Sequence, residues 1–375
     1  MESTTLHEPP AAPGYVGHVA YVYAYDIAYD MADVPVTTLL GRPVRRYESS
    51  PTRRRPRELF FHNPLVIELE EVERRGPHGP VRVSRSVKVF PVGALSLTIG
   101  VPFHVASLTD LTAYHDLELE GRPLRQEVRA LANELLGELR PALVRPVEEV
   151  AEDEAYTVFF IDAASSEIGP EALAWLQRHR VEVAALLTEE ERHRLSSQEV
   201  ADTVRGHLSY YAYDLVVSDW DASLVIDRPQ DMLETLHVIE LANVQLAELQ
   251  AYDRILDTAL SRSYIDLARR PRVKARKAMW ELREISVDLS RLTDELSNTA
   301  KFMGDWHLAR VYHHLAGLFH LDAWRGTIDE KLHTLRDLYR MLREDQISRW
   351  MLMLELTIVL LFVLDLVLLL LPPRH

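Results

Sequence analysis

The chain has 375 residues, which leaves room for two or three domains with a sizeable hydrophobic core. Its 57 acidic residues against 42 lysines and arginines give a formal net charge of −15, which argues against a general nucleic-acid binder. The chain contains no cysteine, which excludes disulfides, thiolate catalysis, zinc–thiolate sites and iron–sulfur clusters.

The first part of the chain has the patterns of strands and short helices. Residues 1–14 are polar and rich in proline, which predicts a disordered lead-in. Tyr21, Tyr23 and Tyr25 alternate with small or branched residues, as in a strand. Further expected elements are a β-hairpin within 65–89, a strand at 92–101, a helix at 124–143, a buried strand at 156–161, helices within 171–206 with Ser197 as a cap, and two strands within 210–226. We therefore expect an α+β head over residues 15–228, with mixed α/β content.

A short motif occurs twice in this head. The sequence Tyr-Ala-Tyr-Asp stands at residues 23–26 and again at 211–214. Two copies could mark duplicated β units or edge strands of one sheet, but matches this short also arise by chance.

From residue 231 onward the pattern is helical. Leucines at 246, 249, 256 and 260 follow a 3-4 spacing. Apolar residues at 328, 332, 335, 339 and 342 form a heptad-like seam. Seams of this length are typical of helices packed as coiled-coil hairpins. We expect such a helical stalk over residues 229–349.

The end of the chain is a long apolar run, residues 351–371, interrupted by Glu355, Thr357 and Asp365. About 20 apolar residues in a helix cross a hydrocarbon core of roughly 30 Å. The run predicts one C-terminal transmembrane helix at 350–371, with a buried core helix as the alternative. Basic residues before the run, and an N-terminus without a secretory signal, predict a tail-anchored protein of a bacterial inner membrane with its bulk on the cytoplasmic side.

The C-terminal third resembles the required-for-meiotic-nuclear-division family. The resemblance covers residues 210–371 and is carried by Asp227-Arg228-Pro229, by Leu354-Glu355 and by Asp365. It implies an α+β body and a membrane-anchored, self-associating protein without known catalysis. The chain departs from the family pattern at Leu356, where a tryptophan is usual, and at residues 304–325, which look like an insertion.

Two groups of residues are candidates for contacts. Glu355 and Asp365 lie roughly 80° apart on a helical wheel, which predicts contacts within the membrane between neighbouring helices; snorkelling and proton transfer are the alternatives. Six basic residues predict contact with lipid headgroups, with a solvated helix start or an RNA contact as alternatives. They are Arg269, Arg270, Arg272, Lys274, Arg276 and Lys277.

Other polar clusters do not form a recognisable site. The aspartates at 214, 219, 221 and 227 suit turns and caps, and the histidines at 307, 313, 314 and 320 lack the spacing of metal ligands. The chain has no P-loop, GxGxxG or GxSxG motif. We therefore expect no enzyme and no catalytic, cofactor-binding or metal-binding residues.

These observations predict a non-catalytic, tail-anchored membrane scaffold. We expect it to form homo-oligomers and to bind other proteins, without direct nucleic-acid binding. One alternative is a membrane-associated metal-dependent enzyme that uses the aspartates of the hairpin. Another is an oligomeric channel or transporter component that uses Glu355 and Asp365.

Overall fold

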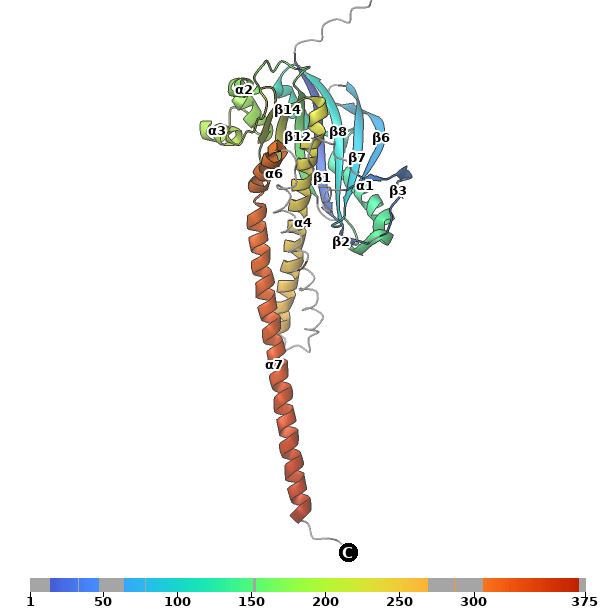
Figure 1. The fold of residues 1–375 in the computed structure, drawn as a ribbon, viewed down its shortest axis with the longest axis vertical. Helices are drawn as coiled ribbons and strands as arrows, with labels where there is room; N and C mark the ends of the chain where they lie inside the picture. Colours follow the sequence, from blue (N-terminus) through green and yellow to red (C-terminus); the bar gives the residue numbers. More distant parts are fainter. Residues whose placement is uncertain are drawn as a thin grey trace, which may run out of the picture. The chain divides into compact units, whose positions relative to one another are not determined.

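The computed structural model describes residues 14–32, 34–46, 64–77, 79–150, 153–268, 287 and 306–370. The chain forms two compact units (Figure 1). The first comprises Met1–Gln250 with Glu295–Asp322, and the second comprises Ala251–Asp294 with Ala323–His375.

An eight-stranded sheet forms the centre of the first unit. β12 and β14 pair in parallel, and the other neighbouring strands of this sheet pair antiparallel. The order across the sheet is β13 (Leu215–Ser218), β14 (Ala222–Asp227), β12 (Glu154–Asp162), β1 (Tyr15–Asp26), β8 (Ala94–Val105), β7 (Gly79–Phe90), β6 (Leu65–Gly76) and β5 (Arg45–Arg46). The predicted hairpin within 65–89 is thus confirmed as β6 and β7.

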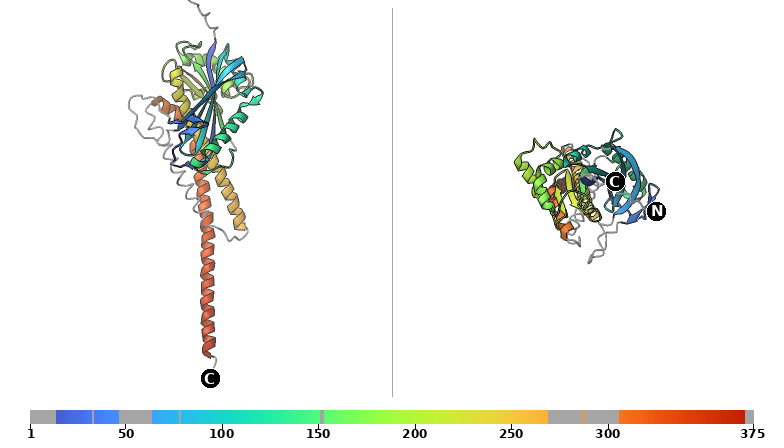
Figure 2. Two further views of the ribbon diagram at one scale, coloured as in Figure 1. Left: turned by 90° about the vertical axis from the view of Figure 1, so that its right-hand side faces the viewer. Right: turned by 90° about the horizontal axis from the view of Figure 1, so that it is seen from above.

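One face of the sheet packs against short helices. The side chains of Tyr21, Tyr23 and Tyr25 alternate onto this face, as predicted, and are buried in the main hydrophobic core. The helices that cover it are η2 (Leu108–Tyr114), α1 (Leu124–Leu139) and α2 (Ala172–Leu187). Figure 2 shows α1 beside the part of the sheet that contains β6, β7 and β8. Trp175 of α2 is fully buried, and its indole N–H donates to the Tyr15 hydroxyl over 3.2 Å.

The opposite face of the sheet packs against the first half of α4 (Pro229–Ala268). Figure 1 shows α4 alongside β12 and β1. Residues 238–249 of this helix are buried on every side, because α6 (Trp306–Leu318) covers the side that the sheet does not. Two hydrogen bonds hold this layer together: Asn243 Nδ2 donates to the Glu154 carbonyl over 3.0 Å, and the Tyr312 hydroxyl donates to Gln245 Oε1 over 2.6 Å.

Short elements connect the larger ones. Ser196, one residue before the predicted cap, caps α3, and its hydroxyl accepts from the Glu199 N–H over 3.1 Å. The short elements are β2 (Ala28–Met31) paired with β11 (Leu143–Pro146), β3 (Thr38–Leu39) paired with β4 (Arg42–Pro43), β9 (Glu118–Leu119) paired with β10 (Arg122–Pro123), η3 (Arg140–Ala142) and α3 (Ser197–Arg205).

The second unit contains the later part of α4 and most of α7 (Leu321–Leu370). Leu256 and the seam residues Ile328, Leu332 and Leu335 are buried. Lys331 of α7 contacts two carboxylates of α4, because its Nζ lies 2.6 Å from oxygens of both Asp253 and Asp257. An apolar seam flanked by ion pairs therefore joins the two helices of this unit.

The predicted transmembrane helix is contradicted. In the part of the chain that the structure describes, no helix is both long and apolar enough to cross a membrane. The predicted tail anchor, the membrane scaffold and the single-pass localisation in a bacterial inner membrane rested on this helix and are wrong with it.

Candidate functional sites

The aspartates of the predicted hairpin support the backbone around them. Asp214 accepts hydrogen bonds from the N–H groups of Tyr210 (2.7 Å) and Tyr211 (3.0 Å), so residues 210–214 form a turn where a strand was predicted. Asp219 accepts from the Trp220 N–H and Asp227 from the Arg228 N–H, each over 2.8 Å. Local turn chemistry accounts for all three carboxylates.

The histidines of α6 also lack the geometry of a metal site. Among the described residues, no three histidine, aspartate or glutamate side chains come together in a way that could hold a metal ion. His314 packs against Gly206, and burial lowers its pKa. His320 follows α6 and lies against Trp220, with ring centroids 5.8 Å apart.

Two sets of predicted contact residues fall partly or wholly outside the described residues. The six basic residues between 269 and 277 lie outside them, as does the side chain of Asp365. Glu355 lies on α7, and its side chain is exposed.

The neighbours of Glu355 form an extended apolar surface on α7. The large apolar side chains between residues 351 and 364 are from 50% (Val363) to 73% (Leu356) exposed in a single copy. These side chains point in every direction around the helix, because they occupy nearly every position of the segment. Soluble proteins rarely expose contiguous apolar patches of this kind unless the patch contacts a partner. This α7 surface is a candidate interaction site.

A buried charged cluster joins the sheet to α4, and sequence reasoning missed it. Lys88 of β7 (7% exposed) forms an ion pair with Glu240 of α4 (1% exposed). The Thr98 hydroxyl donates to Glu240 Oε1 over 2.5 Å, and His237 Nδ1 lies 3.5 Å from Lys88 Nζ. The one available sequence signal was a glutamate between Ile239 and Leu241 in an otherwise apolar stretch of helix.

Electrostatics of this cluster favour a structural role. Burial by itself raises the pKa of Glu240, but the charge of Lys88 and the interactions with His237 outweigh burial and lower this pKa to about 2. The carboxylate is therefore ionised and held between groups of the protein itself. The cluster orients α4 on the sheet.

A groove of about 430 Å³ lies between η2 and the end of α2. Two of its four glutamates pair with arginines: Glu182 with Arg192, and Glu190 with Arg194 over 3.0 Å. Glu191 lies 3.4 Å from His193. Burial lowers the pKa of His115, which also lines the groove. The groove has the size of a ligand site, but two of its four glutamates are already paired with arginines of the protein itself.

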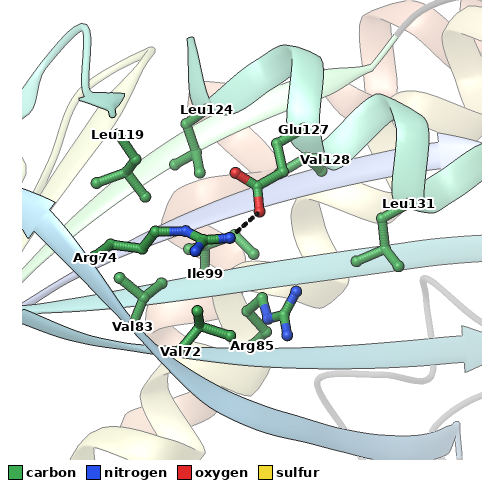
Figure 3. A pocket seen from close by; sticks show the side chains of 10 residues that line it. All are labelled: Val72, Arg74, Val83, Arg85, Ile99, Leu119, Leu124, Glu127, Val128 and Leu131. Atoms are coloured by element: carbon green, nitrogen blue, oxygen red, sulfur yellow. Dashed lines mark ion pairs between the residues drawn. The ribbon is translucent and has the colours of Figure 1, made fainter. Parts of the chain in front are cut away.

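A smaller pocket lies between α1 and the strands β6, β7 and β8 (Figure 3). It combines an apolar lining with Arg74, Arg85 and Glu127. In Figure 3, Arg74 extends toward Glu127, and their charged atoms lie 3.7 Å apart. Arg85 projects from the neighbouring strand without an ion pair to any residue drawn.

The sheet-containing part of the chain matches a known protein family. The family model for the N-terminal domain of the uncharacterized protein MJ0711 matches residues 16–232, more than half of the 375 residues. The chain belongs to this family. The curated uncharacterized protein MJ0711 of Methanocaldococcus jannaschii is 26% identical over 176 residues, which are 45% of this chain and 53% of the relative. The chain thus spans about half the length of the curated relative that it matches, and no solved structure matches it.

These matches place the chain in an uncharacterised family. The matched residues 16–232 lie mostly before residues 210–371, where the resemblance to the required-for-meiotic-nuclear-division family was found. Membership of that second family is not confirmed by the comparisons.

Proposed function

We propose that the protein acts by assembling with further copies of itself and by binding other proteins, rather than by catalysing a reaction. The observation that supports this proposal is the apolar surface of α7 at residues 351–364, which is exposed in a single copy. A relationship to the required-for-meiotic-nuclear-division family, suggested by Leu354-Glu355 and Asp227-Arg228-Pro229, is part of the same proposal.

The occupant of this surface is a second and further copy of α7. A helix that is apolar on all sides needs neighbours on several sides, as at the centre of a helical bundle. Identical helices provide apolar segments of matching length, and closed symmetric assemblies are the usual form of soluble oligomers. We therefore expect a bundle of α7 helices.

The burial of this surface favours association by a substantial free energy. Removing half of a leucine-sized side chain from water stabilises by roughly 1 kcal/mol. Summed over the exposed apolar side chains of residues 351–364, burial contributes on the order of 10 kcal/mol per copy. This is comparable to the loss of translational and rotational freedom on association, about 4–15 kcal/mol, so the charge substitution below is expected to shift the oligomer equilibrium measurably.

The test is the molar mass of the full chain in solution, measured by light scattering after size-exclusion chromatography. Leu360→Lys places a charge in the apolar surface of α7, where Leu360 is 68% exposed. Leu233→Lys is the matched control, because Leu233 on α4 has the same residue type and is also 68% exposed. We expect an oligomer for the wild type and the control, and a smaller species for Leu360→Lys. A monomeric wild type, or an unchanged mass for Leu360→Lys, would show that α7 is not the assembly surface.

A further inference from the structure

The pocket between α1 and the strands β6–β8 lies on the core face of the sheet. Its walls are mainly apolar, and its free space is about 30 Å³. One water-sized probe takes about 10–15 Å³ on this measure, so the pocket has room for two or three non-hydrogen atoms. The apolar side chains that line it are Val72, Val83, Ile99, Leu119, Leu124, Val128 and Leu131.

Arg85 lies beside an irregularity in the sheet. The pairing of β6 with β7 shifts register between Leu69 and Val72, and Glu70 lies within this shift. Arg85 Nη2 donates to the Glu70 carbonyl over 3.2 Å. The guanidinium is thereby held beside the apolar wall of the pocket.

One nitrogen of the Arg85 guanidinium has no hydrogen-bond partner among the described residues. Its Nε is buried without a hydrogen-bond partner, and no carboxylate in the described chain forms an ion pair with it. The side chain as a whole is half-buried, so its outer nitrogens are accessible, and a guanidinium placed in this way beside an apolar wall suits an anion that binds there.

The two arginines that line the pocket differ in their acidic neighbours. Arg74 is balanced by acidic side chains, because its guanidinium lies 3.7 Å from Glu127 and 3.9 Å from Glu120. Arg85 has no such balance. The first turn of α1, a 16-residue helix that begins at Leu124, also lines the pocket and adds the partial positive charge of a helix N-terminus.

From this geometry we infer that the pocket binds a short aliphatic monocarboxylate, with its carboxylate on Arg85. A carboxylate has three non-hydrogen atoms, which match the free space, and a planar guanidinium presents parallel N–H donors that suit it. The short aliphatic chain contacts the leucine and valine side chains at the mouth of the pocket. Inorganic phosphate has the same charge chemistry but no apolar part, so it should bind more weakly.

The experiment measures binding of butyrate to the full-length protein by isothermal titration calorimetry, with butyramide and inorganic phosphate as comparison ligands. We expect butyrate to bind more tightly than either, because butyramide lacks the charge and phosphate lacks the apolar chain. Butyramide binding as tightly as butyrate would overturn the role of the charge. Phosphate binding as tightly would overturn the assignment to a carboxylate.

Variants of Arg85 test whether this residue binds the carboxylate. Arg85→Gln should weaken butyrate binding by about tenfold or more, whereas Arg82→Gln, on the opposite face of the same strand, should leave it unchanged. Arg85→Lys keeps the charge but loses the planar fork, and it should bind butyrate with intermediate affinity; it serves as the test if Arg85→Gln does not fold. Absence of butyrate binding to the wild type, or equal binding by the wild type and the Arg85 variants, would overturn the inference. Neither result depends on the oligomeric state.

Discussion

The ion pair between Lys88 and Glu240 provides a test of how α4 is held on the sheet. Glu240→Gln removes the negative charge beside Lys88 and preserves the shape of the side chain, including an oxygen that can accept from Thr98. A pKa of about 2 for Glu240, against an ordinary 4.5, corresponds to about 3 kcal/mol of stability at neutral pH. Loss of one partner from a buried ion pair lowers the free energy of unfolding by about 3–5 kcal/mol, which agrees with the value from the pKa. We expect Glu240→Gln to lower the free energy of unfolding by about 3 kcal/mol.

The assay is urea unfolding followed by near-ultraviolet circular dichroism, which reports the packing of buried aromatic side chains such as Trp175. The variants Lys88→Met, Glu240→Gln and the double variant form a thermodynamic cycle. The double variant removes both charges, so it should lose about 3 kcal/mol less than the sum of the single variants. Asp202→Asn, which breaks the exposed pair with Arg205, is the control and should change stability by less than about 1 kcal/mol.

The pH dependence gives an independent check. Because the folded-state pKa of Glu240 is lowered, its contribution is present above about pH 4.5 and is lost as the pH falls toward 2. The wild type should therefore lose more stability than Glu240→Gln over this acid range. Additive effects in the cycle, or equal acid sensitivity of the two proteins, would refute the view that the pair acts as a coupled unit.

Two further predictions concern the sheet and its exit into α4. A Cβ at Gly17 would collide with the Phe160 carbonyl oxygen across the β1–β12 pairing, so Gly17→Ala should lower the free energy of unfolding by about 3 kcal/mol. Gly137 lies on α1 with open space around it, so Gly137→Ala should raise the free energy of unfolding by about 0.5–1 kcal/mol. Equal effects of the two substitutions in urea unfolding would contradict this reasoning. Burial raises the pKa of Asp227 to about 6 from 3.8, so native Asp227 retains a proton that the unfolded state has lost, and stability falls as the pH rises from about 4 to 6. Asp227→Asn should therefore be more stable than the wild type above pH 6 and lose this advantage below pH 4; a difference independent of pH would contradict the reasoning.

Much of the first unit could be predicted because its signals are local. The alternation of Tyr21, Tyr23 and Tyr25 indicated β1, and the hairpin of β6 and β7 followed from two alternating runs around a turn. The end of the chain shows the limit of such signals. Its composition predicted a transmembrane helix, and that prediction is contradicted in the described chain.

The repeated Tyr-Ala-Tyr-Asp motif shows why local sequence is insufficient elsewhere. At residues 23–26 it lies in β1 with its tyrosines in the core, whereas at 211–214 it forms a turn around the carboxylate of Asp214. The same four residues adopt two structures because their tertiary surroundings differ. The repeat therefore does not mark two equivalent strands.

The sequence by itself determined several long strands and helices of the first unit and the exclusion of cysteine chemistry, because side-chain periodicity and residue type are properties of neighbouring positions. The tertiary structure decided which distant residues meet. Lys88 and Glu240 are 152 positions apart, and neither has a local signal that identifies its partner. The pocket of Arg85 likewise depends on a register shift in β6 and on α1 closing over it. Contacts of this kind arise only once the sheet has formed, because they depend on pairing and layering that no local pattern encodes.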